Sequence, residues 1–240
     1  MSVDHNSVCI ICARGGSQRL PNKNIKLLDG VPLIAYTIQA ALDSCQFDEV
    51  VVSSDSDDII GVAESSGATT LVKRSSNLAS NTAGLIPSIQ DAVKKIEKLK
   101  ERPYETVTSL QPTSPLKTKE DVIQAMADFY EADASNLFSV TPSKSSPYFS
   151  IVEQDSSGKT TLSKGRETYK RSQDAPESFD LNGAIYIWKR NILMQPNAGL
   201  FYDDTVIYEM PPERSVDIDT ELDFLTAECY LAHQKKGRKV

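Results

Sequence analysis

The first half of the chain alternates short apolar segments with helix-like apolar stripes, and this alternation constrains the fold more than any other feature. Residues 7–13 (SVCIICA) are too few for a helix and predict a buried strand. Residues 32–43 carry aliphatic side chains at helical spacing after a proline, which predicts a helix. The pattern continues with strands expected at 48–53, 68–72 and 106–110 and helices at 57–66, 86–100 and 119–130. It predicts an α/β fold with a mainly parallel sheet and helices on both faces.

The alternation ends after Val140. Residues 141–180 are rich in Ser, Pro, Lys and Gly and contain two short strand-like pieces, 148–153 and 159–162, around the turn DSSG. We expect a small β-hairpin lobe inserted into one domain that spans residues 1–240. A lobe of this size cannot build its own core, so it is expected to pack against a partner subunit. Beyond it, strands are expected at 183–188 and 205–210 and a helix at 221–233.

Composition argues against several classes of function. The chain has 26 Lys and Arg against 33 Asp and Glu, and this net charge of −7 argues against a general nucleic-acid binder. No apolar run approaches the ~18–20 residues of a membrane span, and the N-terminus lacks a signal-peptide pattern, so a cytoplasmic location is expected. Cys9 and Cys12 form a C-x-x-C inside an apolar strand, where we expect buried thiols rather than redox or zinc chemistry.

The loop after the first strand, residues 13–24 (ARGGSQRLPNKN), has the composition of an anion-binding site. It follows the carboxyl end of a parallel strand, where ligands bind in such folds. Gly15 and Gly16 would let backbone N–H groups approach phosphate oxygens, and three cations lie close by: Arg14, Arg19 and Lys23. The loop is neither a P-loop nor a dinucleotide fingerprint. By itself it is equally consistent with a solvated basic surface.

The segment at 215–224 (SVDIDTELDF) places two carboxylates, Asp217 and Asp219, on one side of an extended chain and two aliphatic side chains on the other. Such a pair suits Mg²⁺, which also takes phosphate oxygens from a bound substrate. The alternative is that Asp219 or Thr220 only caps the terminal helix, because TELD resembles a capping box. Capping leaves Asp217 unexplained, so a magnesium site is the favoured interpretation.

A third loop, residues 110–118 (LQPTSPLKT), follows the fourth strand of the alternation. Its prolines and hydroxyl groups predict a rigid polar ledge, on which Gln111 can both donate and accept hydrogen bonds. Taken alone, the same residues are also typical of a stiff connecting loop.

These three segments, together with LVKRSSNLASNTA (71–83) and NGAIYIW (182–188), resemble the CMP-sialic acid synthetase family and follow its motif order across nearly the whole chain. Members are cytidylyltransferases that activate nine-carbon α-keto acid sugars with CTP. The resemblance implies a Rossmann-like nucleotidyltransferase fold and dependence on Mg²⁺. It also implies a homodimer in which the lobe at 141–180 reaches into the neighbouring active site.

The resemblance assigns site residues, each by its place in a motif. The expected nucleotide contacts are Ala13, Arg14, Gly15, Gly16, Ser17, Arg19, Lys23, Asn24, Arg74 (beside the cytosine) and Asn81. The expected sugar contacts are Gln111, Asn182, Tyr186 and Arg171. Asp217 and Asp219 are expected to hold the metal, and with Arg14 and Lys23 they form the expected catalytic set.

Four positions depart from the family pattern. Gln18 stands where a lysine is common, and Asn81 stands where an aspartate is common. In the lobe, Phe149 replaces a lysine and Ser172 an arginine of some sialic acid enzymes, and the adjacent Arg171 is the candidate substitute for that arginine. The lobe sequences SPYF and SQDAPESFDLNGAIYIWKR are closer to the legionaminate-type branch than to enzymes for N-acetylneuraminate.

The expected reaction is an in-line displacement in which the anomeric hydroxyl of the sugar attacks the α-phosphorus of CTP and pyrophosphate leaves. The acceptor of the hydroxyl proton is left open, with Asp217 one candidate. Two alternatives are Kdo cytidylyltransferases, which usually read K-P-L at residues 23–25, and pseudaminate enzymes, which typically lack the QPTSP of residues 111–115. A nucleotide-binding homologue without activity is the alternative from another class, and the presence of both Asp217 and Asp219 argues against it.

Overall fold

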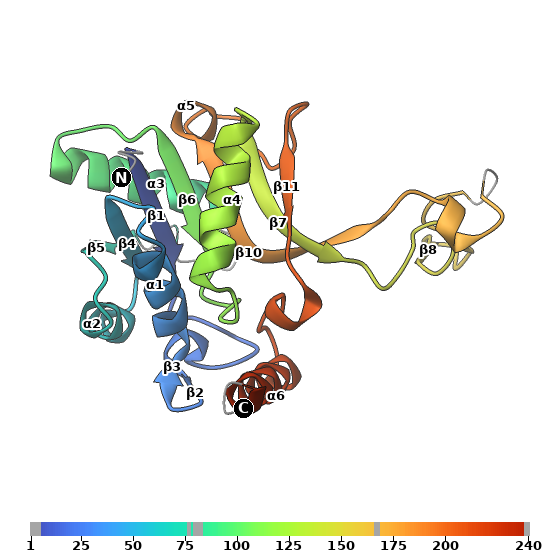
Figure 1. The fold of residues 1–240 in the computed structure, drawn as a ribbon, viewed down its shortest axis with the longest axis horizontal. Helices are drawn as coiled ribbons and strands as arrows, with labels where there is room; N and C mark the ends of the chain where they lie inside the picture. Colours follow the sequence, from blue (N-terminus) through green and yellow to red (C-terminus); the bar gives the residue numbers. More distant parts are fainter. Residues whose placement is uncertain (1–5, 76–77, 79–83, 166–168, 238–240) are drawn as a thin grey trace.

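The computed structural model describes residues 6–75, 78, 84–165 and 169–237. The expected alternation forms a seven-stranded sheet in the order β11-β7-β10-β6-β1-β4-β5 (Figure 1). Neighbouring strands are parallel except for the two pairs that involve β10, so the sheet is mainly parallel, as predicted. The strands are β1 (Ser7–Cys12), β4 (Glu49–Ser54), β5 (Thr70–Lys73), β6 (Thr106–Leu110), β7 (Asn136–Pro142), β10 (Phe179–Lys189) and β11 (Val206–Glu209).

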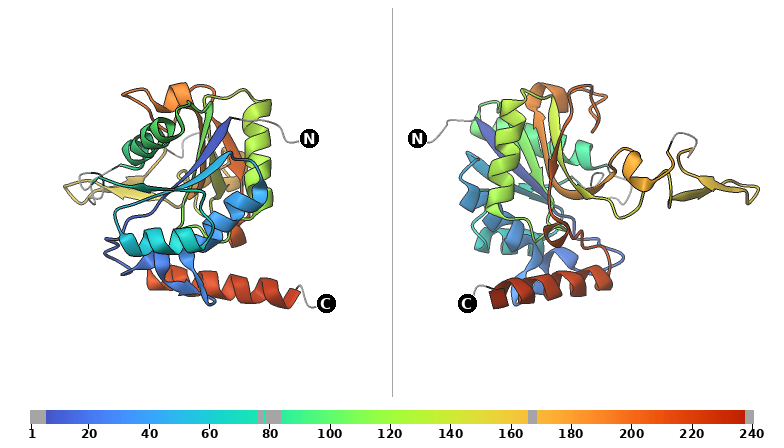
Figure 2. Two further views of the ribbon diagram at one scale, coloured as in Figure 1. Left: turned by 90° about the vertical axis from the view of Figure 1, so that its left-hand side faces the viewer. Right: turned by 45° about the vertical axis from the view of Figure 1, so that its right-hand side comes forward.

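Helices cover both faces of this sheet, because successive side chains of a strand point to opposite sides. In β1, Cys9 and Ile11 enter one core cluster, whereas Val8 and Ile10 enter the other. Helices α1, α2 and α4 close the first cluster, and α3 and α5 close the second (Figure 2). Their bounds are α1 (Leu33–Ser44), α2 (Asp57–Ser65), α3 (Leu85–Lys100), α4 (Lys119–Glu131) and α5 (Arg190–Leu193).

A third core cluster lies under the loops that follow the strands. It joins the C-terminal helix α6 (Glu221–Gly237) to the short hairpin β2 (Leu27–Leu28) and β3 (Val31–Pro32). Ile218, from the acidic segment before α6, is fully buried in this cluster. The packing therefore anchors the acidic segment beside the loop after β1.

The second half of the sheet differs from the expectation in two ways. The sequence pattern does not anticipate β7, and the strand expected at 183–188 begins earlier, at Phe179. Chain order does not reveal that β10 returns to insert between β6 and β7. The pairing of β10 with β7 is interrupted between Leu181 and Tyr186 by a bulge, where Gly183 has φ +69°. That bulge brings the backbone of Gly183 against Asp217.

Outside the sheet, β7 and β10 continue as a two-stranded ribbon that projects from the body and carries the lobe (Figures 1 and 2). The strand expected at 148–153 is shorter: β8 (Val152–Gln154) pairs with β9 (Thr160–Leu162). The preceding residues form a turn instead, because the N–H groups of residues 149–151 all donate to the carbonyl of Ser146. Ile151 and Val152 are exposed on the lobe. A role for the lobe in dimerisation stays a prediction.

The C-x-x-C does not form a paired site. Cys9 and Cys12 pack against opposite core clusters, and both are free thiols. Burial raises the pKa of Cys12 to about 11 and raises that of Cys9 further, so neither is a thiolate at neutral pH. The expectation of buried thiols is confirmed for Cys9, whereas Cys12 is only partly buried. Among the described residues, no helix combines the length and apolar character needed to cross a membrane.

Candidate active site

The loops that carry the motifs converge at the carboxyl edge of the sheet. Residues 13–24 follow β1, Asp55 follows β4, Arg74 follows β5 and Gln111 follows β6. These strands are parallel and adjacent, so their carboxyl ends lie together. A cavity of about 260 Å³ opens there, and its lining includes six residues assigned from the motifs: Arg14, Ser17, Lys23, Asn24, Arg74 and Gln111.

A second cavity, of about 250 Å³, adjoins the first and shares the side chains of Arg14, Ser17 and Lys23 with it. Arg19 and Asp219 complete its charged lining. Three cations of one loop therefore face the same space as a carboxylate from the other end of the chain. This arrangement suits the phosphate chain of a nucleotide whose base and sugar occupy the first cavity.

A short 3₁₀ turn (Lys23–Ile25) directs Lys23 and Asn24 toward the first cavity. The turn follows Asn22, whose φ of 54° is in the left-handed region that asparagine tolerates. The Asn24 amide donates from Nδ2 to the carbonyl of Arg14 at 3.0 Å. Its Oδ1 atom is buried and has no hydrogen-bond partner among the described residues. A hydroxyl or amino group of a bound nucleotide would satisfy this acceptor.

Arg74, which follows β5, packs against the end of the neighbouring strand β4, and only 7% of its surface is exposed. Its Nη2 atom donates to the carbonyl of Ser53 at 3.0 Å, and its Nε atom donates to the hydroxyl of the same residue at 3.5 Å. The guanidinium has five N–H donors, so others remain for a ligand in the cavity that it lines. Its place beside the cytosine stays a prediction.

One glycine of the loop already has a hydrogen-bond partner. The N–H of Gly15 donates to the Asp55 carboxylate at 3.0 Å, so a phosphate would compete with Asp55 for this donor, and the expected contact stays a prediction. A Cβ at Gly15 would lie 3.0 Å from the Cβ of Ser56, which explains the glycine by close packing. Gly16 has open space around it. Ala13 is buried in the core rather than facing either cavity.

Lys23 and Asp219 link the cationic loop to the acidic segment. The Lys23 ammonium donates to Asp219 Oδ1 at 2.8 Å and to the carbonyl of Ile218 at 2.6 Å. Arg19, which is largely exposed, adds a contact with Asp219 Oδ2 at 3.2 Å. Asp219, which the motifs assign to a metal, thus binds the two loop cations that are expected to bind phosphate.

The cap of α6 resolves the alternative interpretation of the acidic segment. Thr220 and Asp223 bond reciprocally, the Thr220 N–H to Asp223 Oδ2 at 2.7 Å and the Asp223 N–H to Thr220 Oγ1 at 3.3 Å. The capping box is therefore present, and its side chains are those of Thr220 and Asp223. Neither Asp217 nor Asp219 supplies the capping side chain.

Asp217 and Asp219 offer the hard oxygen donors that a divalent cation prefers. Partial desolvation raises the pKa of Asp217, and the like charge of Asp219 adds to the rise, whereas Thr113 and Lys23 oppose it. A nearby divalent cation would relieve this repulsion. The described residues hold no group of three or more His, Cys, Asp or Glu arranged for a metal. Two carboxylates nevertheless fit Mg²⁺, which usually keeps waters and binds substrate phosphates.

A family model for cytidylyltransferases matches residues 8–234, nearly the whole chain. The chain belongs to the cytidylyltransferase family. This confirms the resemblance found from the motifs and identifies the protein as a nucleotidyltransferase.

Relatives agree with this membership, and a solved structure shares the fold. The chain is 36% identical to post-translational flagellin modification protein B of Campylobacter coli, over 97% of both chains. It is 37% identical to a CMP-N,N'-diacetyllegionaminic acid synthase of Campylobacter jejuni, over 94% of both. In structure it resembles a CMP:2-keto-3-deoxy-manno-octonic acid synthetase complexed with CTP, with a TM-score of 0.70 at 16% identity over 95% of this chain and 99% of the other. This last likeness supports the predicted nucleotidyltransferase fold.

The residues expected to contact the sugar are distributed unevenly in this cytidylyltransferase. Gln111 lines the first cavity. Tyr186 is buried and stacks on Trp188, and the charge of Asp217 contributes to a raised Tyr186 pKa after burial itself. The Asn182 amide is hydrogen-bonded within the protein: its Oδ1 atom accepts from the Ser139 hydroxyl at 2.6 Å, and its Nδ2 atom donates to the Ser215 hydroxyl at 3.0 Å. Arg171 lies on the projecting lobe, paired with Asp174, and lines neither cavity. Asn81 lies outside the described residues.

The sequence motifs do not predict a role for three polar residues at or beside the candidate site: Asp55, Thr113 and Lys117. Asp55 accepts a hydrogen bond from the glycine loop, Thr113 lines the first cavity and contacts the acidic segment, and Lys117 is buried beneath the loop of Thr113. The position of Asp55 at the end of β4 was the available signal, since parallel strands present such residues to one edge. A lysine in a polar loop gives no comparable signal of burial.

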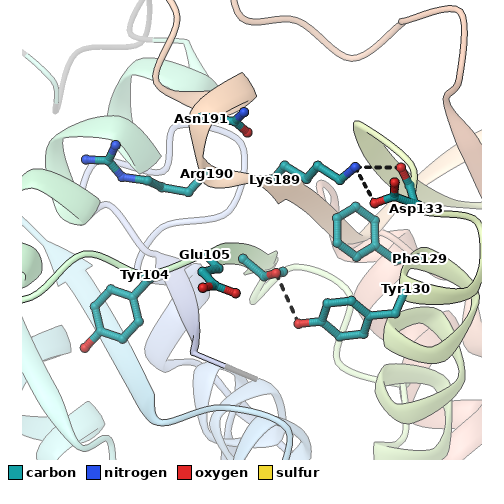
Figure 3. A pocket seen from close by; sticks show the side chains of 9 residues that line it. Tyr104, Glu105, Phe129, Tyr130, Asp133, Lys189, Arg190 and Asn191 are labelled. Carbon is teal, nitrogen blue, oxygen red and sulfur yellow. Dashed lines mark hydrogen bonds and ion pairs between the residues drawn. The ribbon is translucent and has the colours of Figure 1, made fainter. Parts of the chain in front are cut away.

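A cavity of about 460 Å³ lies elsewhere, at the opposite edge of the sheet, between the start of β6, the end of α4 and the end of β10 (Figure 3). Its cations are neutralised within the protein: Lys189 pairs with Asp133 and Arg190 with Glu97. Tyr130 donates to the Thr106 hydroxyl at 3.1 Å. None of the assigned site residues that the structure describes lines this cavity, so the cytidylyltransferase site is sought at the carboxyl edge of the sheet.

Proposed function

We propose that this cytidylyltransferase transfers CMP from CTP to the anomeric hydroxyl of a nine-carbon α-keto acid sugar of the legionaminic acid type. The observation that carries the proposal is the pair of adjoining cavities, joined by Arg14, Ser17 and Lys23 and faced by Asp219. The sugar type is supported by the lobe motifs and by the 37% identity to a CMP-N,N'-diacetyllegionaminic acid synthase. N-acetylneuraminate and pseudaminate are the competing acceptors.

The chain's own groups position CTP and neutralise its charge. The cytosine and ribose would occupy the first cavity, near Arg74, Asn24 and Gln111, and the triphosphate would extend into the second. The anomeric oxygen forms a bond to the α-phosphorus while the bond to the leaving pyrophosphate breaks. Arg14 and Lys23 face the charge that builds on the leaving group, which is where fixed cations accelerate such a displacement.

CTP binding would rearrange existing ion pairs. Lys23 and Arg19 bind Asp219 in the structure, so the triphosphate competes with this carboxylate for both cations. Cytidylyltransferases of this fold commonly use a divalent metal. We propose Mg²⁺, held by Asp217 and Asp219, where it would stabilise negative charge on phosphate oxygens.

We also propose that the enzyme works as a homodimer through the lobe at 141–180. The lobe projects from the body, exposes Ile151 and Val152 and carries Arg171, so a second subunit would give these residues a surface to contact. A cytoplasmic location stays a prediction of the sequence.

The test is turnover by the purified protein with CTP, Mg²⁺ and a panel of acceptors, measured as pyrophosphate and CMP-sugar. The panel contains N,N'-diacetyllegionaminic acid, N-acetylneuraminic acid, pseudaminic acid and 2-keto-3-deoxy-octonic acid. We expect the legionaminic acid to give the highest kcat/KM. Preference for another nine-carbon acid would correct the sugar, and no turnover with any of them would overturn the proposal.

A further inference from the structure

Lys117 is a buried lysine whose three N–H donors are all used inside the protein. It is 4% exposed, and its ammonium donates to the carbonyl of Gln111 at 2.7 Å, to the carbonyl of Ser114 at 2.7 Å and to the hydroxyl of Thr37 at 2.9 Å. All three acceptors are neutral. An ammonium buried without a directly bonded carboxylate costs stability, so its presence calls for an explanation other than a salt bridge.

The three acceptors fix one loop. Gln111 and Ser114 begin and end the turn at 111–114, and a single ammonium holds both of their carbonyls. Thr37, on α1, also donates to the Gln111 carbonyl at 3.2 Å, which joins the turn to a rigid helix. The outer side of the turn is bonded to β10, because the Gln111 N–H donates to Ala184 and the Ser114 hydroxyl to Asn182.

The fixed turn contacts both halves of the site. Gln111 and Thr113 line the nucleotide cavity. The Thr113 carbonyl accepts the N–H of Ile218 at 2.7 Å, and the Thr113 side chain bonds to Asp217 and so lowers its pKa. A displacement of the turn would therefore move the wall of the nucleotide cavity and the acidic segment together.

The environment of Lys117 is that of a buried residue beside the site and not that of a solvated surface lysine. Burial lowers its pKa to about 7, while the charges of Asp217 and Asp121 act in the opposite direction. Perturbed groups of this kind gather at functional sites. Lys119, two residues along the chain, is half-exposed and makes only a weak contact with Glu120, so it provides a matched comparison.

We propose that Lys117 is a positioning residue for cytidylyl transfer: it fixes the turn at 111–114 so that Gln111 and Thr113 face the nucleotide while Thr113 holds the segment of Asp217. The inference rests on CTP-dependent turnover by this enzyme. In-line transfer is catalysed mainly by positioning, so a loosened turn lowers kcat even where CTP still binds.

The test compares Lys117→Met with Lys119→Met. Methionine keeps the volume of the lysine stem but removes the lysine's hydrogen bonds to three buried acceptors, of which the Gln111 carbonyl keeps its bonds from Thr37 and Ser114. We expect kcat per folded molecule to fall at least tenfold in Lys117→Met, with a smaller change in the KM for CTP, and to stay within twofold of wild type in Lys119→Met. Lys117→Arg, which keeps a charged multiple donor, is expected to recover part of the loss. A purely structural lysine would lower the melting temperature of Lys117→Met and leave kcat per folded molecule unchanged, and that result would overturn the inference.

Thr37→Val keeps the test decisive if Lys117→Met does not fold. The change is nearly isosteric, lies on α1 outside both cavities, and removes one acceptor of Lys117 together with the Thr37 bond to Gln111. We expect a threefold or larger loss of kcat, and wild-type kcat in Thr37→Val would contradict the proposal. Wild-type protein is the reference throughout. Its failure to turn over CTP would refute the proposed function, whereas equal activity of wild type and variants would refute only the role of Lys117.

Discussion

Lys23 binds a carboxylate 196 positions away in the chain, and this pairing defines the site at the scale of single residues. The cations of the first loop are not free before a ligand arrives, because Asp219 holds both Lys23 and Arg19. Asp55 similarly holds the Gly15 N–H. The protein's own carboxylates thus lie at positions where the sequence alone suggests phosphate.

Asp55→Asn tests this view of the glycine loop. The amide retains an oxygen acceptor for the Gly15 N–H but removes a negative charge from beside the triphosphate cavity. A partly screened charge of this kind is worth about 0.5–1 kcal/mol, so we expect the KM for CTP to fall about two- to fivefold. Steady-state kinetics beside Asp58→Asn, an exposed carboxylate in the first turn of α2, would measure the effect. An increase in KM would show instead that the charge of Asp55 is needed to hold the loop.

Lys117 gives the stability of the protein a predictable dependence on pH. Its pKa of about 7 in the folded protein lies well below the ordinary lysine value, because burial disfavours the charge. Between pH 7 and about pH 10 the lysine is protonated in the unfolded chain but largely neutral in the folded protein, so the free energy of unfolding rises with pH. Below about pH 7 the lysine is charged in both states, and its burial destabilises the folded protein in full. We expect denaturation midpoints of the wild type to rise from pH 7 to pH 9 relative to those of Lys117→Met. Parallel curves for the two proteins would contradict the burial of a titrating lysine.

At the scale of elements, one buried carboxylate ties the start of α4 to the chain before the acidic segment. Asp121 closes the capping box of α4 with Thr118. It also receives two bonds from Arg214, each at 2.9 Å, and one from the Tyr208 hydroxyl at 3.0 Å. Because Arg214 lies three residues before Asp217, this network helps to place the proposed metal ligands.

Arg214→Met should destabilise the protein and slow turnover. The change leaves the buried Asp121 without a charged partner that is itself 31% exposed, while Thr118 and Tyr208 still donate to the carboxylate, so we expect a cost of about 1–3 kcal/mol. Denaturant titration would measure the loss, and we expect kcat per folded molecule to fall as well, because the acidic segment loses an anchor. Arg102→Met, which breaks a more exposed pair with Asp48, is expected to cost about 1 kcal/mol or less. Equal effects of the two substitutions would argue against the network.

The parts predictable from sequence were those with local signals. The strand–helix alternation gave the parallel part of the sheet, and the loops after β1 and β6 carried recognisable residues. The insertion of β10 between β6 and β7 had no local signal, because sheet order depends on where a returning strand finds an open edge. The Gly15–Asp55 bond and the burial of Lys117 depend on contacts between distant segments, and a charged residue in a polar loop ordinarily indicates exposure.

At the scale of the whole molecule, the lobe projects from the body with exposed apolar side chains, and this arrangement is hard to explain in a monomer. The Ser143 N–H donates to the Ser178 carbonyl at 2.9 Å, so the two ends of the lobe lie side by side at the tip of the ribbon. Residues 144–177 can therefore be replaced by an Asn-Gly hairpin turn without stretching the body.

This deletion tests the proposed dimer. We expect the wild type to be dimeric and the shortened protein monomeric by light scattering, with a folded body and strongly reduced turnover, because the lobe is proposed to reach the neighbouring site. A shortened protein that remains a full dimer would place the subunit interface elsewhere. A monomeric wild type with full activity would remove the need for a partner.

The central claim is that the cationic loop after β1 and the acidic segment before α6 form one CTP-dependent site. The direct measurement is pyrophosphate release from CTP and a nine-carbon keto acid by wild type, Asp219→Asn and Glu221→Gln, the last an exposed carboxylate two residues beyond Asp219 that pairs with Lys26. We predict that Asp219→Asn lowers kcat at least a hundredfold with its melting temperature retained, and that Glu221→Gln stays within twofold of wild type. Wild-type turnover by a folded Asp219→Asn protein would contradict the account.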